Sequence, residues 1–169
     1  MLTLEEVSAH IEIRQVLAAY ARGVDRCDVD LLKSCYHEDA TDQHTMFNGS
    51  GHAFADFIVD LCTKMGGTSL HQITSVHIDL KGTRADVESY YIAFQQFRDE
   101  QGIDRLLVAG GRYLDRFEER GGAWKIAKRI CTMDCSRDPF PNEPSAISKD
   151  FPKVGPKGVD PLYALFAEA

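Results

Sequence analysis

Four long segments of alternating apolar and polar residues constrain the fold more than any other feature of the sequence. We expect β-strands over residues 68–79, 85–94, 103–117 and 123–130, because β-branched and aromatic residues alternate with polar ones there. Short connections rich in glycine join them, and strands joined in this way pair antiparallel. The pair at 110–111 is Gly-Gly, which predicts a bulge or bend inside the third strand. The sequence therefore predicts an antiparallel meander that bends to cover the preceding segments.

Helical signals dominate the first part of the chain. Thr3 and Glu6 form the pattern of a capping box, and apolar residues then recur at helical spacing to about residue 24. Asp28 is a suitable N-cap for a second, short helix over residues 29–36. Both helices would bury one apolar side.

A strand and a third helix are expected before the meander. Residues 37–39 (His-Glu-Asp) should end the second helix, residues 40–47 alternate loosely as a strand, and residues 48–51 resemble a turn. A helix with Phe54 on its apolar face follows and should end at the Gly-Gly pair 66–67. The predicted class is α+β, with three helices followed by a curved sheet.

The C-terminal tail differs in composition from the rest. Residues 136–169 hold all six prolines, and residues 138–144 are too rich in proline for regular structure. Residues 161–167 could form a short helix with Pro161 at its first position. We expect a domain over residues 1–135 and a proline-rich arm that wraps the surface or a neighbouring subunit.

Composition excludes several classes of function. A chain of 169 residues with 44% hydrophobic content is expected to form one domain, and its formal net charge of −7 argues against nucleic-acid binding. No apolar run is long enough for a membrane span, and the N-terminus does not resemble a secretion signal. The five cysteines are scattered, and the pair Cys131 and Cys135 fits no zinc spacing. Reduced thiols in a cytoplasmic protein are the expected state.

His71 and Asp25 are the candidates for acid–base chemistry. His71 opens a strand on the opposite face from Leu70, and a partly buried imidazole there could transfer protons at neutral pH. The alternative is a histidine on the strand surface. Asp25 follows the first helix, where the helix dipole disfavours a carboxylate unless a cation or hydrogen-bond donor lies nearby. The alternative is a solvated acid beside Arg26.

Neither a metal nor a cofactor is expected. His37, His44 and His52 lie within sixteen positions, but on a loop, a strand and a turn without ligand-type spacing. No Gly-x-Gly-x-x-Gly motif occurs, and no Ser or Cys stands in a nucleophile elbow, which disfavours covalent catalysis.

The order of these elements resembles the nuclear transport factor 2-like superfamily, and within it the SnoaL-like and scytalone dehydratase-like branch. The similarity covers residues 1 to about 135: the acid Asp25 after the first helix, Tyr36–Ala40 before the first strand, His71 within Leu-His-Gln, and the closing segment Trp124–Arg129. The resemblance implies a cone, in which a curved antiparallel (mixed) sheet wraps three N-terminal helices and leaves a largely apolar pocket.

The resemblance also implies a set of site residues. Catalytic members of the branch, which include bile acid 7α-dehydratase and hexachlorocyclohexane dehydrochlorinase, bring together an acid and a histidine at the positions of Asp25 and His71. Tyr20 resembles a pocket tyrosine, with plain core packing as the alternative. Arg129 resembles a pocket arginine, although it could serve only to neutralise Asp25 or Asp134. Side chains that could line the pocket, or serve equally as core, are Met46, Phe54, Phe57, Tyr91, Phe94 and Tyr113.

The implied function is that of a cofactor-independent lyase in the catabolism of aromatic compounds. Asp25 would fix the imidazole of His71, which removes a proton or returns one to a leaving hydroxyl, while Tyr20 or Arg129 stabilises the developing oxyanion. The substrate would be a hydrophobic, hydroxylated aromatic or polycyclic small molecule that loses water. Loss of formaldehyde from a lignin-derived diaryl compound and isomerisation are variants.

Two other functions remain open at this stage. One is a small-molecule binding module without chemistry. The other is a structural subunit like the small subunit of ring-hydroxylating dioxygenases, although the presence of both dyad residues argues against it. The resemblance also implies a homo-oligomer, most often a trimer, that binds neither nucleic acid nor membranes.

Overall fold

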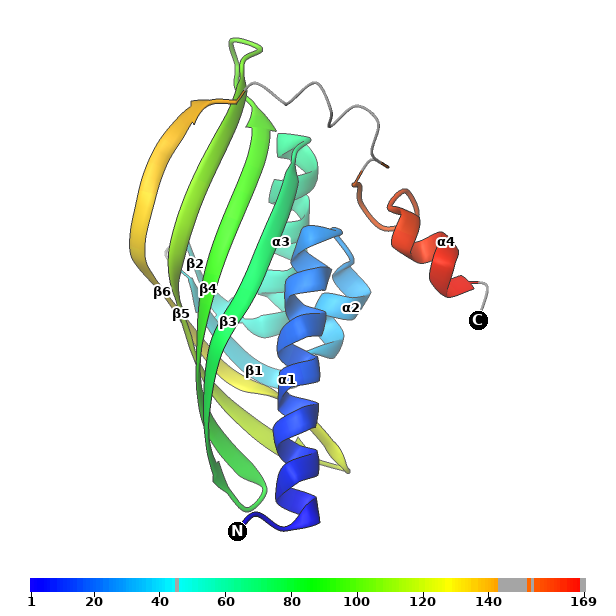
Figure 1. Ribbon diagram of the computed structural model, residues 1–169, viewed down its shortest axis with the longest axis vertical. Helices are drawn as coiled ribbons and strands as arrows, with labels where there is room; N and C mark the ends of the chain where they lie inside the picture. The colour runs from blue at the N-terminus through cyan, green and yellow to red at the C-terminus, as the bar shows by residue number, and fades with distance from the viewer. Residues whose placement is uncertain (45, 143–151, 153, 168–169) are drawn as a thin grey trace.

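Helices cover one face of a curved six-stranded sheet in the computed structural model, which describes residues 1–44, 46–142, 152 and 154–167 (Figure 1). The helices packed against the sheet are α1 (Leu4–Asp25), α2 (Val29–Ser34) and α3 (Gly51–Met65). A fourth, α4 (Pro161–Ala167), lies apart from the sheet, beyond α1 and α2. None of the helices in the described ranges has the length and apolar character needed to cross a bilayer.

The helix ends follow the local sequence signals. Thr3 Oγ1 accepts a hydrogen bond from the Glu6 backbone N–H at 3.2 Å, and the Glu6 carboxylate accepts one from the Thr3 N–H at 2.7 Å, so the capping box is confirmed. Asp28 caps α2 as predicted. Gly66 ends α3 with φ +63°, a conformation that glycine adopts without strain.

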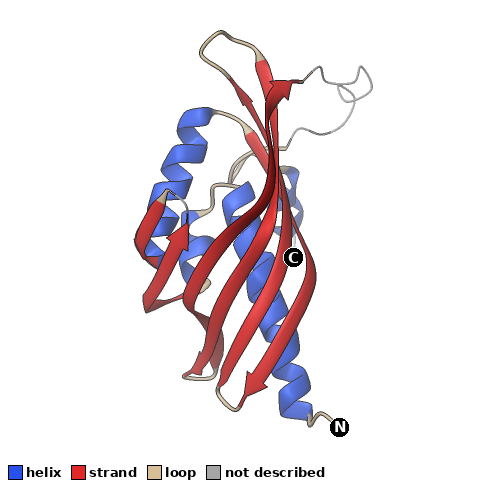
Figure 2. Ribbon diagram, turned by 90° about the vertical axis from the view of Figure 1, so that its left-hand side faces the viewer, coloured by secondary structure: helices blue, strands red, loops and turns tan. Residues whose placement is uncertain are grey.

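The sheet is mixed, as predicted for a cone. Its strand order is β2-β1-β6-β5-β4-β3, in which β3 to β6 form the antiparallel meander and β1 pairs parallel with β6. Figure 2 shows the long strands bending around the helices. The strands are β1 (Tyr36–His44), β2 (Phe47–Ser50), β3 (Thr68–Lys81), β4 (Arg84–Arg98), β5 (Asp104–Arg120) and β6 (Ala123–Pro141).

The expected break at residues 37–39 is wrong. These residues lie in β1, which begins at Tyr36, and α2 ends two residues earlier at Ser34. Pairing with β6 and burial of Tyr36 and Ala40 outweigh the local preference of a polar segment for a loop. The predicted turn at 48–51 is also wrong, because it forms β2 and the first residue of α3.

The prediction that residues 138–144 lack regular structure is wrong for residues 138–141 and holds for Asn142. Residues 138–141 continue β6, and Pro141 pairs with Arg105 of β5. Beyond Ile130, the residues that pair with β6 come from β5 alone. Among the described residues, the other edge of this part of the strand has no partner, and a proline without an N–H can be accommodated there. Residues 143–144 lie outside the described residues.

The concave face of the sheet and the inner side of α1 form the core. Ile13 and Leu17 of α1 pack in the same buried cluster as Phe117 and Ile126 of the sheet. The predicted bulge is confirmed, since the register of β5 and β6 shifts between Gly110 and Gly111. A methyl group at Gly111 would come within 2.0 Å of a backbone oxygen of β6, so this close approach requires glycine.

The C-terminal segment docks on the junction of α1 and α2. Lys157 donates a hydrogen bond from its backbone N–H to the Arg26 carbonyl at 2.6 Å, and its Nζ lies 2.8 Å from Asp28 Oδ1. Arg26 pairs with Asp160 at 3.0 Å. The predicted helix at residues 161–167 is confirmed as α4. The division into a domain and an arm after residue 135 falls inside β6 and stays a prediction.

Candidate active site

Asp25 and His71 are in direct contact where the end of α1 meets the start of β3. Asp25 Oδ1 lies 2.6 Å from Nδ1 of the His71 ring, and Asp25 Oδ2 accepts a hydrogen bond from the His71 backbone N–H at 2.9 Å. Ser69 adds a third hydrogen bond, from its hydroxyl to Asp25 Oδ1 at 2.8 Å. The carboxylate is therefore held from two positions on β3, and no hydrogen bond to Nε2 of the imidazole is present within the described part of the chain.

Strand parity explains how β3 presents these groups. Ser69, His71 and Ile73 occupy alternate positions and are partly buried against α1, whereas Leu70 faces outward with 48% exposure. On the helix side, Asp25 is the last residue of α1, and Cys27 has φ +50°, so the chain turns sharply directly after the acid. The C-terminal end of α1 thus contacts β3, the edge strand of the sheet.

The dyad is nearly closed from solvent. The side chains of Asp25 and His71 are 7% and 9% exposed. Burial acts to raise the pKa of Asp25, but the hydrogen bond and charge of His71, together with the other donors, outweigh it and hold this pKa below its usual value. Asp25 is therefore a carboxylate at neutral pH, and its contact with Nδ1 orients the imidazole.

Two hollows reach the dyad. A cleft of about 240 Å³ lies between α3 and the sheet, with Asp25 and Ser69 on its wall and apolar side chains such as Leu61 and Leu107 around them. A groove of about 380 Å³ lies between α1, β3 and α4, and both Asp25 and His71 line it. A small molecule in either hollow would lie beside the carboxylate, and one in the groove would also reach the imidazole.

Arg129 and Tyr20 lie together, but in the core. Arg129 is fully buried, pairs with Asp115 through two hydrogen bonds of 2.7 and 2.6 Å, and stacks between the rings of Tyr20 and Tyr113 at 3.9 and 4.1 Å. The alternative expectation that it neutralises Asp25 or Asp134 is wrong, because its acidic partner is Asp115. In the described ranges, neither Tyr20 nor Arg129 makes a hydrogen bond or ring contact with the dyad.

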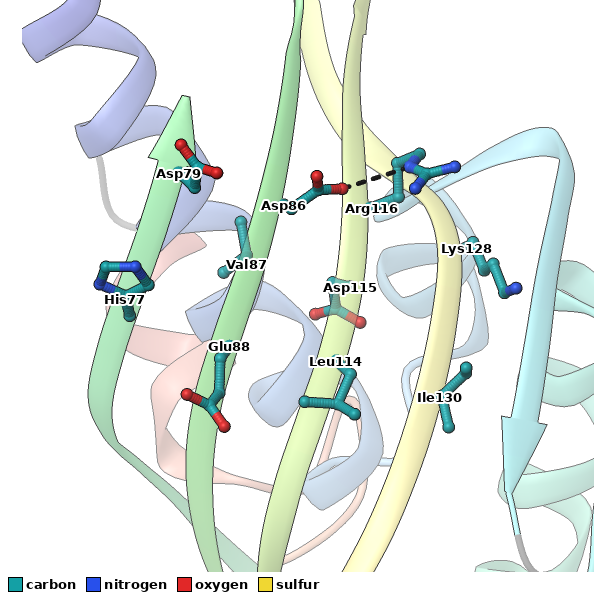
Figure 3. A pocket seen from close by; sticks show the side chains of 10 residues that line it. All are labelled: His77, Asp79, Asp86, Val87, Glu88, Leu114, Asp115, Arg116, Lys128 and Ile130. Atoms are coloured by element: carbon teal, nitrogen blue, oxygen red, sulfur yellow. Dashed lines mark hydrogen bonds and ion pairs between the residues drawn. The ribbon is translucent and has the colours of Figure 1, made fainter. Parts of the chain in front are cut away.

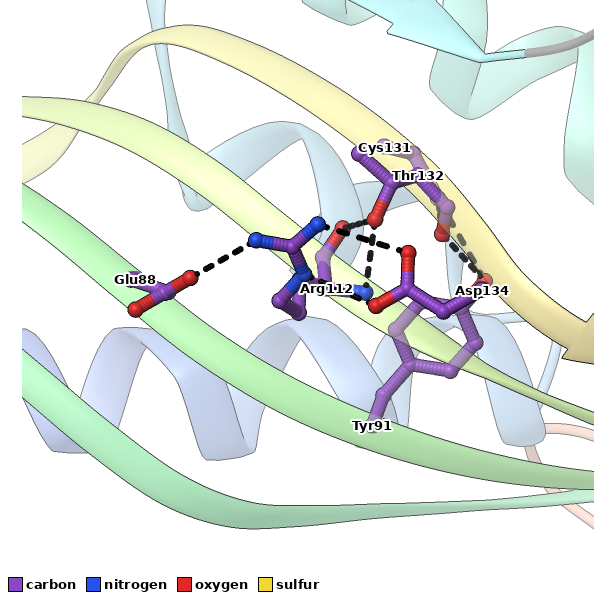
Figure 4. Close-up of polar contacts among 6 residues, drawn as sticks. All are labelled: Glu88, Tyr91, Arg112, Cys131, Thr132 and Asp134. Atoms are coloured by element: carbon purple, nitrogen blue, oxygen red, sulfur yellow. Dashed lines mark hydrogen bonds and ion pairs between the residues drawn. The ribbon is translucent and has the colours of Figure 1, made fainter.

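Asp134 instead belongs to the outer face of the sheet. Arg112 Nε donates to it at 2.8 Å, and Arg112 Nη1 donates to Glu88 at 3.0 Å (Figure 4). A shallow hollow of about 430 Å³ lies on the same face, with Asp86 and Arg116 among its charged lining (Figure 3). The sheet separates this hollow from the dyad.

The predicted pocket residues divide into three groups. Met46 lines the cleft. Phe54 and Tyr113 are core residues, each 2% exposed, and Phe57 stacks on the ring of Phe47. Tyr91 lies closest to the dyad, with its ring centroid 6.5 Å from that of His71.

Phe94 does not share the concave face with the dyad. It stands one position from Ala93, whose buried side chain points into the cone, so Phe94 projects from the opposite face of β4. The assignment of Phe94 to the pocket is therefore wrong.

A second histidine–aspartate pair was not anticipated. His44 Nδ1 hydrogen-bonds to Asp42, whose other oxygen accepts from the Tyr36 hydroxyl at 2.6 Å, and the His44 ring stacks on Phe54 at 4.2 Å. Burial acts to lower the pKa of His44, but hydrogen bonds with Asp42 and Cys131 raise it to about 9. The Asp-x-His spacing on a strand, which places both side chains on one face, was the available signal.

No metal centre is evident among the described residues. No group of three or more His, Cys, Asp or Glu side chains there is arranged to hold an ion. Of the three clustered histidines, His37 bonds to the Glu118 carbonyl at 2.9 Å and His44 to Asp42. Independence from metals and cofactors stays a prediction.

The comparisons with known proteins agree with this architecture. A family model described as the SnoaL-like domain matches residues 5–130. This chain belongs to the SnoaL-like family of the NTF2-like superfamily. No curated protein sequence matches it closely enough to serve as a relative.

Solved structures resemble this SnoaL-like protein over most of its length. A type 2 hexachlorocyclohexane dehydrochlorinase (LinA) aligns with a TM-score of 0.74 and 16% identity over 85% of this chain and 96% of its own. A scytalone dehydratase-like protein from Novosphingobium aromaticivorans aligns with a TM-score of 0.69 and 19% identity, covering 90% and 95%. The β subunit of a proposed aromatic-ring-hydroxylating dioxygenase from the same organism aligns with a TM-score of 0.60 and 24% identity, covering 77% and 92%. At these identities the similarities establish the fold alone.

Proposed function

We propose that this SnoaL-like protein is a cofactor-independent lyase in which His71 and Asp25 act as the general acid–base dyad. The observation that carries the proposal is the 2.6 Å contact between the two side chains, nearly closed from solvent and at the junction of two hollows. A positioned acid–base group of this kind typically contributes about 10²–10⁴-fold in rate.

The hydrogen bonds suggest how the dyad divides its work. Asp25 accepts the proton of Nδ1, which leaves Nε2 as the basic nitrogen of the neutral imidazole. Nε2 would take a proton from a carbon next to an activating group, and the carbon–oxygen bond would then break. The imidazolium, stabilised by the Asp25 carboxylate, would return the proton to the leaving hydroxyl, so that the products are an alkene and water.

The surroundings favour a hydrophobic substrate. The groove that both Asp25 and His71 line is walled by the apolar side chains of Ala18, Ala21, Ile73 and Leu162, which suit the apolar body of a hydroxylated aromatic molecule. Related folds carry the names dehydrochlorinase and dehydratase, both of which denote eliminations. We therefore place water loss first and formaldehyde loss from a lignin-derived diaryl compound second, in an aromatic catabolic role.

The remaining predictions attach to this proposal. The side chains of Tyr20 and Arg129 are buried in the core, so the proposed mechanism assigns no step to them. Donation of a hydrogen bond or proton from either side chain to the substrate stays a prediction. The five cysteines are free thiols, which supports a reducing, cytoplasmic location. A homotrimer is proposed from the family resemblance, and light scattering would measure it.

Two substitutions at the dyad test the proposal. Asp25→Asn and His71→Ala should each lower kcat/KM for water loss from β-hydroxy ketones that carry an aromatic ring by about 10²-fold or more. The conjugated product is followed by its ultraviolet absorbance. His77→Ala is the matched control, because His77 lies on the same strand but is exposed on the outer face.

Circular dichroism of all the variants should show an unchanged fold. Activity of His71→Ala equal to that of the wild type, or a rate with the wild type no faster than in buffer across the set of ketones, would contradict the proposal. Tight retention of an aromatic ligand by His71→Ala without any product would favour the binding module. Activity of a larger enzyme that requires this chain, independent of the dyad, would favour the structural subunit.

A further inference from the structure

The groove on the outer side of α1 is completed by a distant part of the chain. Its floor is formed by Asp25 and His71, its sides by α1 and by Ile73 of β3, and its rim by Leu162 of α4. The ion pair of Arg26 with Asp160 and the contact of Lys157 with Asp28 hold the segment around α4 against the α1–α2 junction. The groove therefore depends on the C-terminal segment.

Arg22 is the cation of this groove that no carboxylate neutralises. Among the described residues it forms no ion pair, and its Nε atom is buried without a hydrogen-bond partner. Arg26, which also lines the groove, is by contrast paired with Asp160 at 3.0 Å. An unpaired guanidinium stands out in a chain whose formal net charge is −7.

The aromatic residues of α4 hold Arg22 in place. The guanidinium lies 5.4 Å from the ring centroid of Tyr163 and 5.1 Å from that of Phe166. Rings at such distances attract the cation through their faces and fix its plane, and among the described residues no carboxylate pairs with its N–H donors. A planar carboxylate accepts two such donors at once.

Among the described residues, Asp25 forms no ion pair with Arg22. Its two oxygens already accept hydrogen bonds from His71 and Ser69. Besides Arg22, the dyad and Arg26, which pairs with Asp160, the groove is lined by the apolar side chains of Ala18, Ala21, Ile73 and Leu162. The groove thus combines the unpaired guanidinium of Arg22 and apolar walls with the hydrogen-bonded Asp25–His71 dyad.

We propose that this groove binds a hydrophobic carboxylate, with Arg22 bound to the carboxylate group and the apolar body lying against Ala21, Ile73 and Leu162 beside His71. The inference rests on the proposed function in one respect, because it adds hydrophobic carboxylates to the neutral ketones as substrates on which the dyad acts. Binding itself does not require that the dyad be catalytic.

A matched pair of ligands tests the charge requirement. trans-Cinnamate and cinnamamide share their aromatic body and differ in the carboxylate, and their Kd values are measured by chemical-shift titration of the full-length protein. Wild type should bind cinnamate about tenfold more tightly than the amide, since a charge-assisted bidentate pair is replaced by a neutral contact. Arg22→Gln should abolish the preference.

Arg14→Gln is the control for Arg22→Gln. Arg14 lies two turns earlier on the same helix and donates to the Val76 carbonyl at 3.2 Å, outside the groove. Its replacement should leave the tenfold preference intact. Leu162→Trp provides a second variant, which keeps Arg22 but fills the groove, and it should weaken cinnamate binding.

The inference would be overturned if wild type bound no cinnamate up to about 10 mM, a concentration above the Kd expected for so small a ligand. Equal Kd values for cinnamate and cinnamamide, or a preference for cinnamate that survives Arg22→Gln, would overturn it as well. In those cases Arg22 serves only to clamp α4. His71→Ala separates this inference from the proposed function, because it should keep the cinnamate preference while losing elimination.

Discussion

Raising the pH should destabilise the fold through one histidine, His44. Its pKa is about 9 in the folded protein, where it bonds to Asp42 and Cys131, whereas an unfolded histidine titrates at about 6.5. The folded state therefore binds the proton more tightly. This contribution to stability is fully present below pH about 6.5 and is lost as the pH rises through about 9.

The size of the effect follows from the difference in pKa. Each unit of difference corresponds to about 1.4 kcal/mol, so the shift from about 6.5 to about 9 corresponds to about 3–4 kcal/mol at most. The His44 side chain is 21% exposed, so solvent screens the pair only in part. A loss of this size would be a large fraction of the stability of a domain of this length.

Urea unfolding followed by tryptophan fluorescence measures this loss. Trp124 is the single tryptophan and is 6% exposed, so its emission reports on unfolding of the core. We compare the free energies of unfolding of wild type and His44→Asn at several pH values from about 6 to about 9. The gap between them should narrow by up to about 3 kcal/mol across this range, because only the wild type loses the protonated imidazole.

His77→Asn is the control, because His77 is exposed on β3. The difference in free energy of unfolding between wild type and His77→Asn should not change with pH. A gap for His44→Asn that is equally flat would refute the reasoning, since it would mean that His44 titrates in the folded protein as it does in the unfolded chain. A gap that widens with pH would reverse the sign of the expected shift.

Two further predictions concern the core. Gly111→Ala should destabilise the protein by about 2–3 kcal/mol or more, because the added methyl group would lie 2.0 Å from the Thr132 carbonyl oxygen. At Gly110 the nearest atom is 3.2 Å away, so Gly110→Ala is the control and should lower the melting temperature clearly less in a thermal melt. Asp115→Ala should cost about 3–5 kcal/mol in urea unfolding, because it leaves the guanidinium of Arg129 buried without its partner. Destabilisation below about 1 kcal/mol would contradict this account of the pair.

The sequence predicted the elements whose signals are local. The capping box of Thr3 and Glu6, the N-cap Asp28 and the glycine that ends α3 each act within a few residues, and all are present in the structure. Alternation likewise predicted the meander, because each strand carries its own pattern. The α+β class and the curved mixed sheet followed from these elements and from the family resemblance.

Local sequence signals predicted only part of the candidate site. Asp25 and His71 are 46 residues apart, and their pairing was expected through the resemblance, since no local signal joins them. The identity of the acidic partner of Arg129 and the face from which Phe94 projects depend on the register of the β-sheet. A shift of that register by one residue would move each side chain to the opposite face. Sequence reasoning therefore paired Asp25 with His71 but misassigned the surroundings of Arg129 and Phe94.

Tertiary structure decided whatever depends on contacts between distant segments. Residues 37–39 form a strand because β6 pairs with β1. The prolines near residue 140 remain in β6, where within the described ranges only β5 pairs with the strand. Arg22 meets the aromatic residues of α4, about 140 positions later, only because the C-terminal segment folds back onto α1. Local propensities fix short segments, whereas the free energy of pairing and burial is gained only when the whole chain has folded.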